Sequence, residues 1–304
     1  MTLTRILLPV AALVLSPFLF GVINRIKAQF AGRRGRPLLQ AYFDIAKLLK
    51  KGAVYGRTTG PVFRFAPAVV LAAAMLAVLL LPWGGIPAPV AFPGDFVLLA
   101  YLLGVTRFFT VLAALDTGSA FEGMGASREV QFAALGEPTL LLGMLLLAVQ
   151  TGELSTSSMM REIHIDTWQA SPAAIVLLAI AWMVLLLTEN SRIPVDDPNT
   201  HLELTMIHEV MVLDTGGPEL GLITLASSLK LFIFGGLLSN LLIPLRPSSP
   251  FIQAALFFVG VVAVAVVVGV VESVMGRLRL IQIPKLLIGS TVLTATALVM
   301  KLAG

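Results

Sequence analysis

The stretch Phe251-Ile-Gln-Ala-Ala-Leu-Phe-Phe-Val-Gly-Val-Val-Ala-Val-Ala-Val-Val-Val-Gly-Val-Val271 contains no charged residue and a single polar side chain, Gln253. A helix needs about 20 mostly apolar residues to cross the hydrocarbon core of a bilayer, and this stretch meets that length. The whole chain has the same character, because 57% of its 304 residues are hydrophobic and only 12% are charged. Soluble domains carry roughly 25% charged residues, so the composition excludes a soluble enzyme and predicts an integral membrane protein.

Further stretches of similar length and composition predict an all-α, polytopic protein with about eight transmembrane helices in one membrane domain, 1–304. The expected spans are Ile6–Ile23, Phe65–Leu81, Phe96–Leu115, Phe132–Val149, Pro172–Leu187, Leu220–Ile243, Phe251–Val271 and Pro284–Leu302.

The loops between these spans differ in charge, and the difference predicts the orientation. Most Lys and Arg residues fall in alternate loops, at about 25–64, 116–131, 189–219 and 272–283. Cytoplasmic loops carry the excess of positive charge in membrane proteins. These long charged loops are therefore expected in the cytoplasm, and both termini on the outer side.

The composition also limits the cofactors that this chain can hold. It has no cysteine and three histidines, which excludes disulfides, thiolate zinc sites and Cys-ligated iron–sulfur clusters in this chain. We predict that it holds no redox cofactor and that any electrons move through another chain. Nucleic-acid binding is also excluded, because the basic residues lie beside membrane spans and form no separate basic domain.

The first cytoplasmic segment contains a short amphipathic stretch. Residues 38–51 place apolar side chains at a spacing near 3.6 and end in a cluster of lysines that includes Lys47. This pattern predicts an interfacial helix whose lysines meet anionic headgroups. A plain positive-inside anchor is the alternative, but Asp44 on the lipid-facing side does not fit it.

Two carboxylates flank the start of the fourth span. Glu129 and Glu137 are about two helical turns apart and could form steps of a proton relay, because a charge at membrane depth is costly and usually functional. The alternative for Glu129 is that it only pairs with Arg128 or Arg107. The sequence places no cation next to Glu137, which favours a functional role there.

The densest group of charges follows the fifth span, from Glu189 to Glu209. Arg192 has a spacing that suits pairing with Glu189 or Asp196, and Pro194 and Pro198 favour a folded loop. Residues 200–213 then have helical spacing. The same region contains His201, Glu203, His208 and Glu209. A zinc peptidase would need His-Glu-x-x-His, which is absent here, so a metal site is disfavoured. A proton-handling or docking role is expected instead, and the sequence leaves both open.

These segments resemble one family. The pattern Glu189-x-x-Arg192-x-Pro194-x-Asp196 resembles the acidic loop of the membrane subunit that forms the quinone chamber of respiratory complex I. The wording from Ile193 to Glu209 is similar to subunit 4 of formate hydrogenlyase and its relatives in the group 4 membrane-bound nickel–iron hydrogenases. Other matching elements are Asp44 with Lys47, Arg128 with Glu129, and Arg277 with Arg279.

The resemblance implies a non-catalytic subunit that anchors a soluble hydrogenase arm and couples it to ion-translocating membrane subunits. Glu129, Glu137, Glu189, Asp196, Glu203 and Glu209 would then handle protons or ions, with Asp44, Lys47, Arg128, Arg192, Arg277 and Arg279 as charge partners that order the loops.

The implied partners are the large and small hydrogenase subunits on the cytoplasmic side, which would hold the nickel–iron centre and iron–sulfur clusters, and antiporter-like membrane subunits. The implied location is the cytoplasmic membrane of a bacterium or archaeon. The alternative is the quinone-chamber subunit of complex I. A free-standing ion transporter is disfavoured, because the charges crowd at the cytoplasmic boundary and not at broken helices in mid-bilayer.

Overall fold

The computed structural model describes residues 2–197 and 206–303, and within these ranges eight helices are long and apolar enough to cross a membrane. They are α1 (Thr2–Phe30), α3 (Pro61–Val78), α4 (Asp95–Asp116), α5 (Ala120–Thr151), α8 (Pro172–Glu189), α9 (Gly217–Leu242), α10 (Pro250–Val274) and α11 (Ile283–Ala303). The all-α, multi-span fold predicted from hydropathy is confirmed.

Shorter helices occupy the loops between the spans. The amphipathic stretch of the first loop forms α2 (Gln40–Leu49), and the loop after α5 contains α6 (Thr156–Arg161) and α7 (Ile165–Ala170). Two 3-10 turns, η1 (Glu209–Val212) and η2 (Leu280–Gln282), precede α9 and α11.

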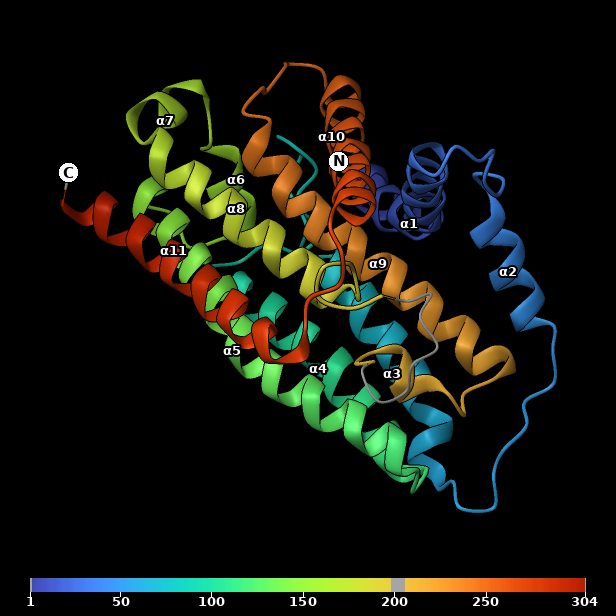
Figure 1. Cartoon of the computed structure of the whole chain (residues 1–304). Coiled ribbons are helices and arrows are strands. Elements are labelled where there is room, and N and C mark those ends of the chain that lie inside the picture. The colour runs from blue at the N-terminus through green and yellow to red at the C-terminus, as the bar shows by residue number, and fades with distance from the viewer. Residues whose placement is uncertain (1, 198–205, 304) are drawn as a thin grey trace.

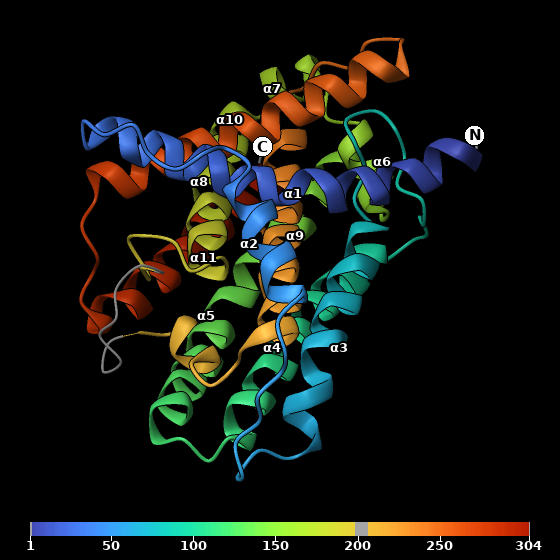
Figure 2. The same ribbon diagram turned by 90° about the vertical axis from the view of Figure 1, so that its right-hand side faces the viewer.

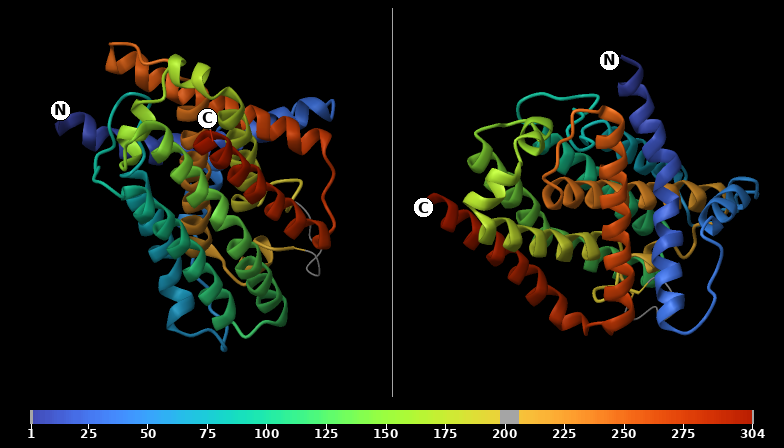
Figure 3. Two further views of the ribbon diagram at one scale, coloured as in Figure 1. Left: turned by 90° about the vertical axis from the view of Figure 1, so that its left-hand side faces the viewer. Right: turned by 90° about the horizontal axis from the view of Figure 1, so that it is seen from above.

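Helix α9 is the central helix of the bundle. It packs against α1, α2, α3, α8 and α10. Helices α5, α8 and α11 run together on one side of it, and α3 and α4 pair on another (Figure 1). Helices α1 and α10 lie side by side and cross α9 steeply, as the view from above shows (Figure 3). Many spans therefore meet around the middle of α9, which brings polar residues from distant segments together.

A side-chain hydrogen bond and a close backbone approach attach α2 to α1. Pro17 has no N–H, so the carbonyl of Leu13 lacks its helical donor, and the Ser16 hydroxyl donates to it at 3.4 Å. One residue on, the Tyr42 hydroxyl of α2 donates to the carbonyl of Val14 at 2.5 Å. Gly21 faces the backbone of Leu38 so closely that a side chain there would collide with it.

The end of the bundle that contains α6 and α7 is joined by neutral hydrogen bonds and by one buried carboxylate. Asp95 at the start of α4 is fully buried and accepts hydrogen bonds from the Ser155 hydroxyl and from the amide and hydroxyl of Thr156, at 2.6–2.7 Å. The Asn240 side chain accepts from Gly84 N and donates to the carbonyl of Pro82, both at 2.9 Å. These contacts fix the loops at this end to α4 and α9.

Helix α5 begins earlier than its hydropathy indicates. The span is expected from Phe132, whereas the helix starts at Ala120. Its first turns have their own packing partners, since Gly125 lies against Ile207, Val210 and Met211. Glu129 is consequently inside the helix and not in the loop before it.

The loop after α8 is buried within the protein. Val195, Asp196 and Ile207 are at most 1% exposed, and η1 packs against α4 and α5. The predicted helix over 200–213 is wrong for its described part, 206–213, which contains only η1. The amides of Ile207 and His208 donate to the Asp196 carboxylate, at 3.2 and 3.0 Å, and not to a preceding helical carbonyl.

Candidate functional site

Arg107 on α4 is the centre of a buried group of charges. Its guanidinium is 2.7 Å from a carboxylate oxygen of Glu137 and 2.9 Å from one of Glu189, and its Nε is 3.4 Å from Glu129. Glu129 and Glu137 come from α5 and Glu189 from the end of α8, so this one side chain joins three spans. Arginine suits such a position because its planar group has five N–H donors.

Lys230 on α9 extends the group on the other side of Glu189. Its ammonium is 2.8 Å from Glu189 Oε2, while Arg107 contacts Oε1. Each oxygen of this carboxylate therefore has its own cation, although its side chain is only 6% exposed. A buried charge is tolerated only with such partners.

His208 connects this group to the loop after α8. Its Nε2 lies 3.0 Å from Glu129 Oε2 and its Nδ1 lies 3.4 Å from Asp196 Oδ2. The other oxygen of Asp196 is 3.0 Å from Nη2 of Arg277, in the connection between α10 and α11. Because both ring nitrogens face carboxylates, the geometry favours the doubly protonated imidazolium, which donates from both nitrogens.

The charges around His208 and Asp196 shift their pKa values in opposite directions. Burial alone would lower the pKa of His208, but the negative charges of Glu129 and Asp196 overcome this and raise it to about 9. Burial would raise the pKa of Asp196, but hydrogen bonds from His208 and the charges of His208 and Arg277 hold it below its ordinary value. Both groups are therefore charged at neutral pH.

This pairing predicts a specific loss of stability at alkaline pH. A histidine whose pKa is raised on folding stabilises the folded state fully below its unfolded pKa of about 6.5, and this contribution is lost as the pH rises through about 9. The melting temperature of the purified protein should fall across that range, and His208→Gln should start lower and show a flatter alkaline limb. His164→Gln, at an exposed histidine, is the matched control. Parallel alkaline limbs in wild type and His208→Gln would contradict the assignment.

A second ion group holds the same loop against α1 and α10. Arg192 lies 3.4 Å from Glu272 of α10, whose other oxygen is 2.7 Å from the Lys27 ammonium of α1. The Arg192 guanidinium also lies over the ring of Phe20, 5.0 Å from its centroid. Arg192 thus pairs with neither Glu189 nor Asp196, and both of those pairings predicted from spacing are wrong. The chain reverses after α8, at Ser191 with a positive φ of 54°, and carries Arg192 away from both.

The first group forms one continuous series of ion pairs through the described part of the chain. It runs from Arg277 through Asp196, His208 and Glu129 to Arg107, and from there to Glu137 and to Glu189 with Lys230. With His208 protonated, the four carboxylates are balanced by the four cations. We call these eight residues the charge chain.

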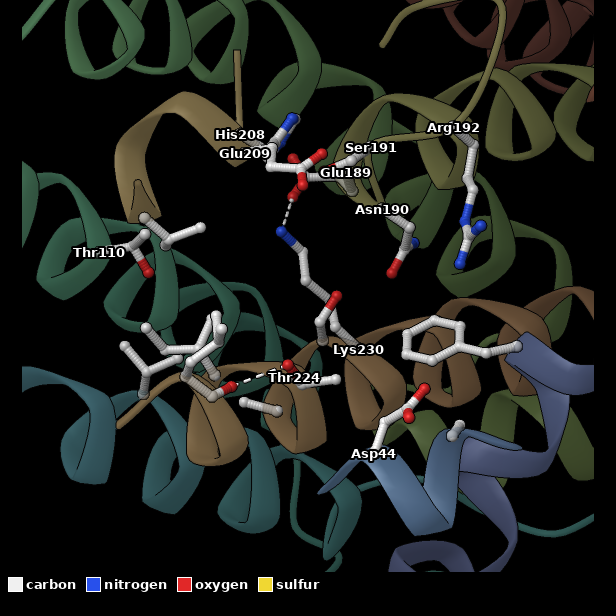
Figure 4. A pocket seen from close by; sticks show the side chains of 18 of the residues that line it. Asp44, Thr110, Glu189, Asn190, Ser191, Arg192, His208, Glu209, Thr224 and Lys230 are labelled. Carbon is white, nitrogen blue, oxygen red and sulfur yellow. Dashed lines mark hydrogen bonds and ion pairs between the residues drawn. The ribbon is translucent and has the colours of Figure 1, made fainter. Parts of the chain in front are cut away.

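A half-open cavity of about 400 Å³ lies beside the charge chain, and its walls include residues of α1, α2, α4, α9 and the loop after α8. Figure 4 shows Lys230 reaching from α9 toward Glu189, with Asp44 of α2 on the far side of the lysine. Arg36, Arg192 and Glu209 also line it. Its walls carry both signs of charge, so the cavity suits water and mobile protons better than a wholly apolar ligand.

Comparison with known proteins identifies the family. The family model described as NADH dehydrogenase matches residues 2–303. This chain belongs to the NADH dehydrogenase family. It is 32% identical to formate hydrogenlyase subunit 4 of Escherichia coli K12 over 287 residues, which is 91% of this chain and 92% of that protein. It is 31% identical to hydrogenase-4 component C of the same organism over 280 residues, 90% of this chain and 87% of that protein.

A solved structure shares the fold of this member of the NADH dehydrogenase family. A chain in the membrane-bound sulfane sulfur reductase, an archaeal respiratory membrane complex, superimposes with a TM-score of 0.82 and 23% identity. The match covers 99% of both chains. The family matches confirm the resemblance proposed from the motifs, since the relatives are a subunit of formate hydrogenlyase and a component of hydrogenase-4.

In this family member, the structure brings together most of the carboxylates selected from the sequence. Glu129, Glu137, Glu189 and Asp196 all belong to the charge chain, while Glu209 lines the cavity and Glu203 lies outside the described residues. The sequence places no cation next to Glu137, but the structure supplies one from α4, 30 positions away, in Arg107.

The residues selected as charge partners are more dispersed. Arg277 belongs to the charge chain, and the Arg128 guanidinium donates to the carbonyl of Met206 at 2.7 Å. Asp44 lines the cavity and accepts a hydrogen bond from Gln40 at 2.8 Å. Lys47 and Arg279 are exposed, and neither is part of either ion group.

Five residues of the two ion groups are not among those selected from the sequence: Lys27, Arg107, His208, Lys230 and Glu272. Arg107 and Lys230 have a readable signal, since each is an isolated cation within a predicted span, and such residues need partners at that depth. Glu272 lies where a span meets a charged loop, and His208 has no local signal that separates it from the other histidines. Only their long-range partners identify these two.

Proposed function

We propose that this chain is the non-catalytic membrane-anchor and energy-coupling subunit of a membrane-bound hydrogenase complex. It would join a soluble redox arm to the ion-translocating membrane arm, and the nickel–iron centre and iron–sulfur clusters would belong to the soluble large and small subunits. The relatives support this assignment, because they are subunits of formate hydrogenlyase and of hydrogenase-4. The proposed location is the cytoplasmic membrane, with both termini on the outer side.

The observation that carries the proposal is the route of the charge chain. One end, Arg277, lies in the charged connection between α10 and α11, which the positive-inside rule assigns to the cytoplasm. Another end, Glu137, has a side chain 53% exposed on the outer surface of α5, in a stripe with the exposed Leu141 and Leu145. A half-exposed carboxylate among apolar side chains would be costly against lipid. A neighbouring membrane subunit would therefore cover Glu137.

The balance of charges explains how the chain could move a proton. A carboxylate that loses a nearby cation favours its protonated form. If a movement of the loop after α8 withdrew His208 from Glu129, two cations, Arg107 and Lys230, would remain for the three carboxylates Glu129, Glu137 and Glu189. The excess negative charge would then be relieved by protonation, with the cavity as the source of the proton. A loop movement driven by the soluble arm would thus be converted into proton uptake inside the membrane.

The anchoring role rests on the cytoplasmic loops. Loop 31–36 is exposed and basic, as are Lys47 of α2 and Lys50 directly after it, and Leu39 and Phe43 are exposed beside them. This segment, 25–64, is the surface that we expect the soluble arm to contact. The antiporter-like subunits would lie beside α5, where Glu137 reaches the surface.

The substitution Glu189→Gln tests the coupling role. It keeps the size of the side chain and much of its hydrogen bonding but removes its charge. We expect the complex to assemble in native membranes and its soluble arm to turn over with an artificial electron carrier at the wild-type rate, while ion translocation into inverted vesicles is lost. The reason is that Glu189 is the partner of both Arg107 and Lys230 in the charge chain, so that each of these cations would lose a charged partner.

Glu162→Gln is the matched control, because Glu162 is 43% exposed and makes only a surface ion pair, at 3.5 Å, with Arg161. It should leave turnover and translocation unchanged. Full translocation by the Glu189→Gln complex would overturn the coupling role and leave an anchoring loop. Loss of the soluble arm from Glu189→Gln membranes would also overturn it, since Glu189 would then act in assembly.

A further inference from the structure

Lys230 is an isolated cation on the helix at the centre of the bundle. It is the only charged residue from Leu220 to Leu242. Helix α9 runs through the middle of the bundle, with α2 packed along it (Figure 2). The Lys230 side chain is only 13% exposed and reaches into the cavity beside the charge chain (Figure 4). A lysine at this depth costs free energy, so its position indicates a functional role.

The wall of the cavity beside Lys230 is rich in oxygen atoms. Glu189 Oε2 lies 2.8 Å from the ammonium. Further side-chain oxygens on the wall of the same cavity come from Asn190, Ser191, Thr224 and Ser227. Asn190 is 5% exposed, and its Oδ1 atom accepts no hydrogen bond from the described residues. Carboxylate and amide oxygens are the ligands that hard metal cations prefer, so this wall without the lysine would suit a small cation such as Na⁺.

The buried carboxylates of the charge chain have their oxygens occupied by basic groups. Glu129, Glu189 and Asp196 each have a basic nitrogen within 3.4 Å of both carboxylate oxygens. In the described part of the chain, Arg107 and His208 each join at least two carboxylates, whereas the ion pair of Lys230 is with Glu189 alone. Removal of Lys230 therefore frees one oxygen of Glu189 and leaves the other ion pairs in place.

We propose that Lys230 makes the charge chain selective for protons, because its ammonium holds the position beside Glu189 that Na⁺ would otherwise occupy. A tethered ammonium and Na⁺ carry the same charge and bind the same oxygens, and a second cation close to the ammonium is repelled in a low-dielectric interior. A proton is not excluded in this way, because it binds a single oxygen and needs no shell of ligands. This inference rests on the proposed function, since it names the ion that the charge chain takes up.

The test detects sodium binding through stability, with the full-length chain purified in detergent. Thermal unfolding is followed at equal concentrations of NaCl and choline chloride, so that the ionic strength is the same. An ion that binds only the folded state raises the melting temperature. We expect Lys230→Gln to melt about 3 °C higher in NaCl, the shift for sodium at about ten times its Kd. The wild type should melt at the same temperature in both salts.

Three further variants assign the effect to this position. Lys285→Gln, at an exposed lysine outside both ion groups, is the matched control and should behave as the wild type. Lys230→Met removes the charge without adding an oxygen, and it gives the same comparison if Lys230→Gln folds poorly. The double substitution of Glu189→Gln with Lys230→Gln removes the carboxylate as well, so the sodium effect should vanish.

Three outcomes overturn the proposal: sodium stabilises the wild type, sodium stabilises neither Lys230 variant, or the double variant keeps the sodium effect. Each of them leaves the coupling role standing, because this experiment measures no translocation. The coupling role is tested by translocation in the Glu189→Gln complex, and its failure is therefore a separate result.

Discussion

Replacing Arg107 with methionine is expected to lower the free energy of unfolding by about 3–5 kcal/mol, the usual cost of removing one partner from a buried ion pair. The substitution leaves Glu129, Glu137 and Glu189 without the side chain that contacts all three, and the Glu129 and Glu189 side chains are each only 6% exposed. Ion translocation should be lost with it. The measurement is thermal unfolding in detergent, followed by the fluorescence of the buried Trp83 and Trp182.

Two other variants make the Arg107 result specific. Arg107→Lys should be intermediate, because an ammonium cannot contact three carboxylates from one position as a guanidinium does. Arg161→Met removes an exposed arginine with a single surface pair and should change stability by less than about 0.5 kcal/mol. Equal melting temperatures for Arg107→Met and Arg161→Met would show that Arg107 does not hold the three spans together.

The second large effect is expected at the opposite end of the bundle. Asp95→Ala should destabilise the fold by about 3 kcal/mol, because it leaves the Ser155 hydroxyl and both donors of Thr156 buried without an acceptor. Asp95→Asn keeps one oxygen and should lose less. Chemical denaturation in a mixed-micelle system would measure both.

The prediction for Asp95 also separates stability from function. Asp95 belongs to neither ion group, so ion translocation per assembled complex should stay at the wild-type level in Asp95→Asn. Asp166→Ala, at an exposed carboxylate of α7, is the matched control and should be neutral. If Asp95→Ala proves as stable as that control, the hydrogen bonds to Asp95 are replaceable by water and this end of the bundle is not fixed by them.

Local rules were sufficient for much of the fold. Each of the eight long helices overlaps one of the stretches expected from hydropathy, and α2 forms where the amphipathic spacing indicates. The predicted helix boundaries are wrong where tertiary contacts override the local sequence pattern. Helix α5 extends back to Ala120 because its first turns pack against η1, and residues 206–208 stay irregular because Asp196 takes the amides of Ile207 and His208.

The candidate site shows the same division. Glu129, Glu189 and Asp196 stand out in the sequence because a carboxylate in or beside a membrane span costs free energy. Such a residue therefore indicates a functional role or an ion pair. Arg107 and Lys230 also stand out, as isolated cations within predicted spans, but the sequence does not show which carboxylate each cation pairs with. Spacing assigns Arg192 to Glu189 or Asp196, yet it lies beside Glu272, 80 positions away. Spacing rules describe neighbours on one helix, and these partners come from different helices.

The sequence by itself determined which segments enter the membrane and which loops carry positive charge, because partition between lipid and water depends on the composition of each segment alone. Only the tertiary structure decided which carboxylate meets which cation. Arg107 and Glu189 are 82 positions apart, and Arg277 and Asp196 are 81 apart. An ion pair in a low-dielectric interior depends on distances of a few ångströms, and those distances are set by how the spans cross around α9.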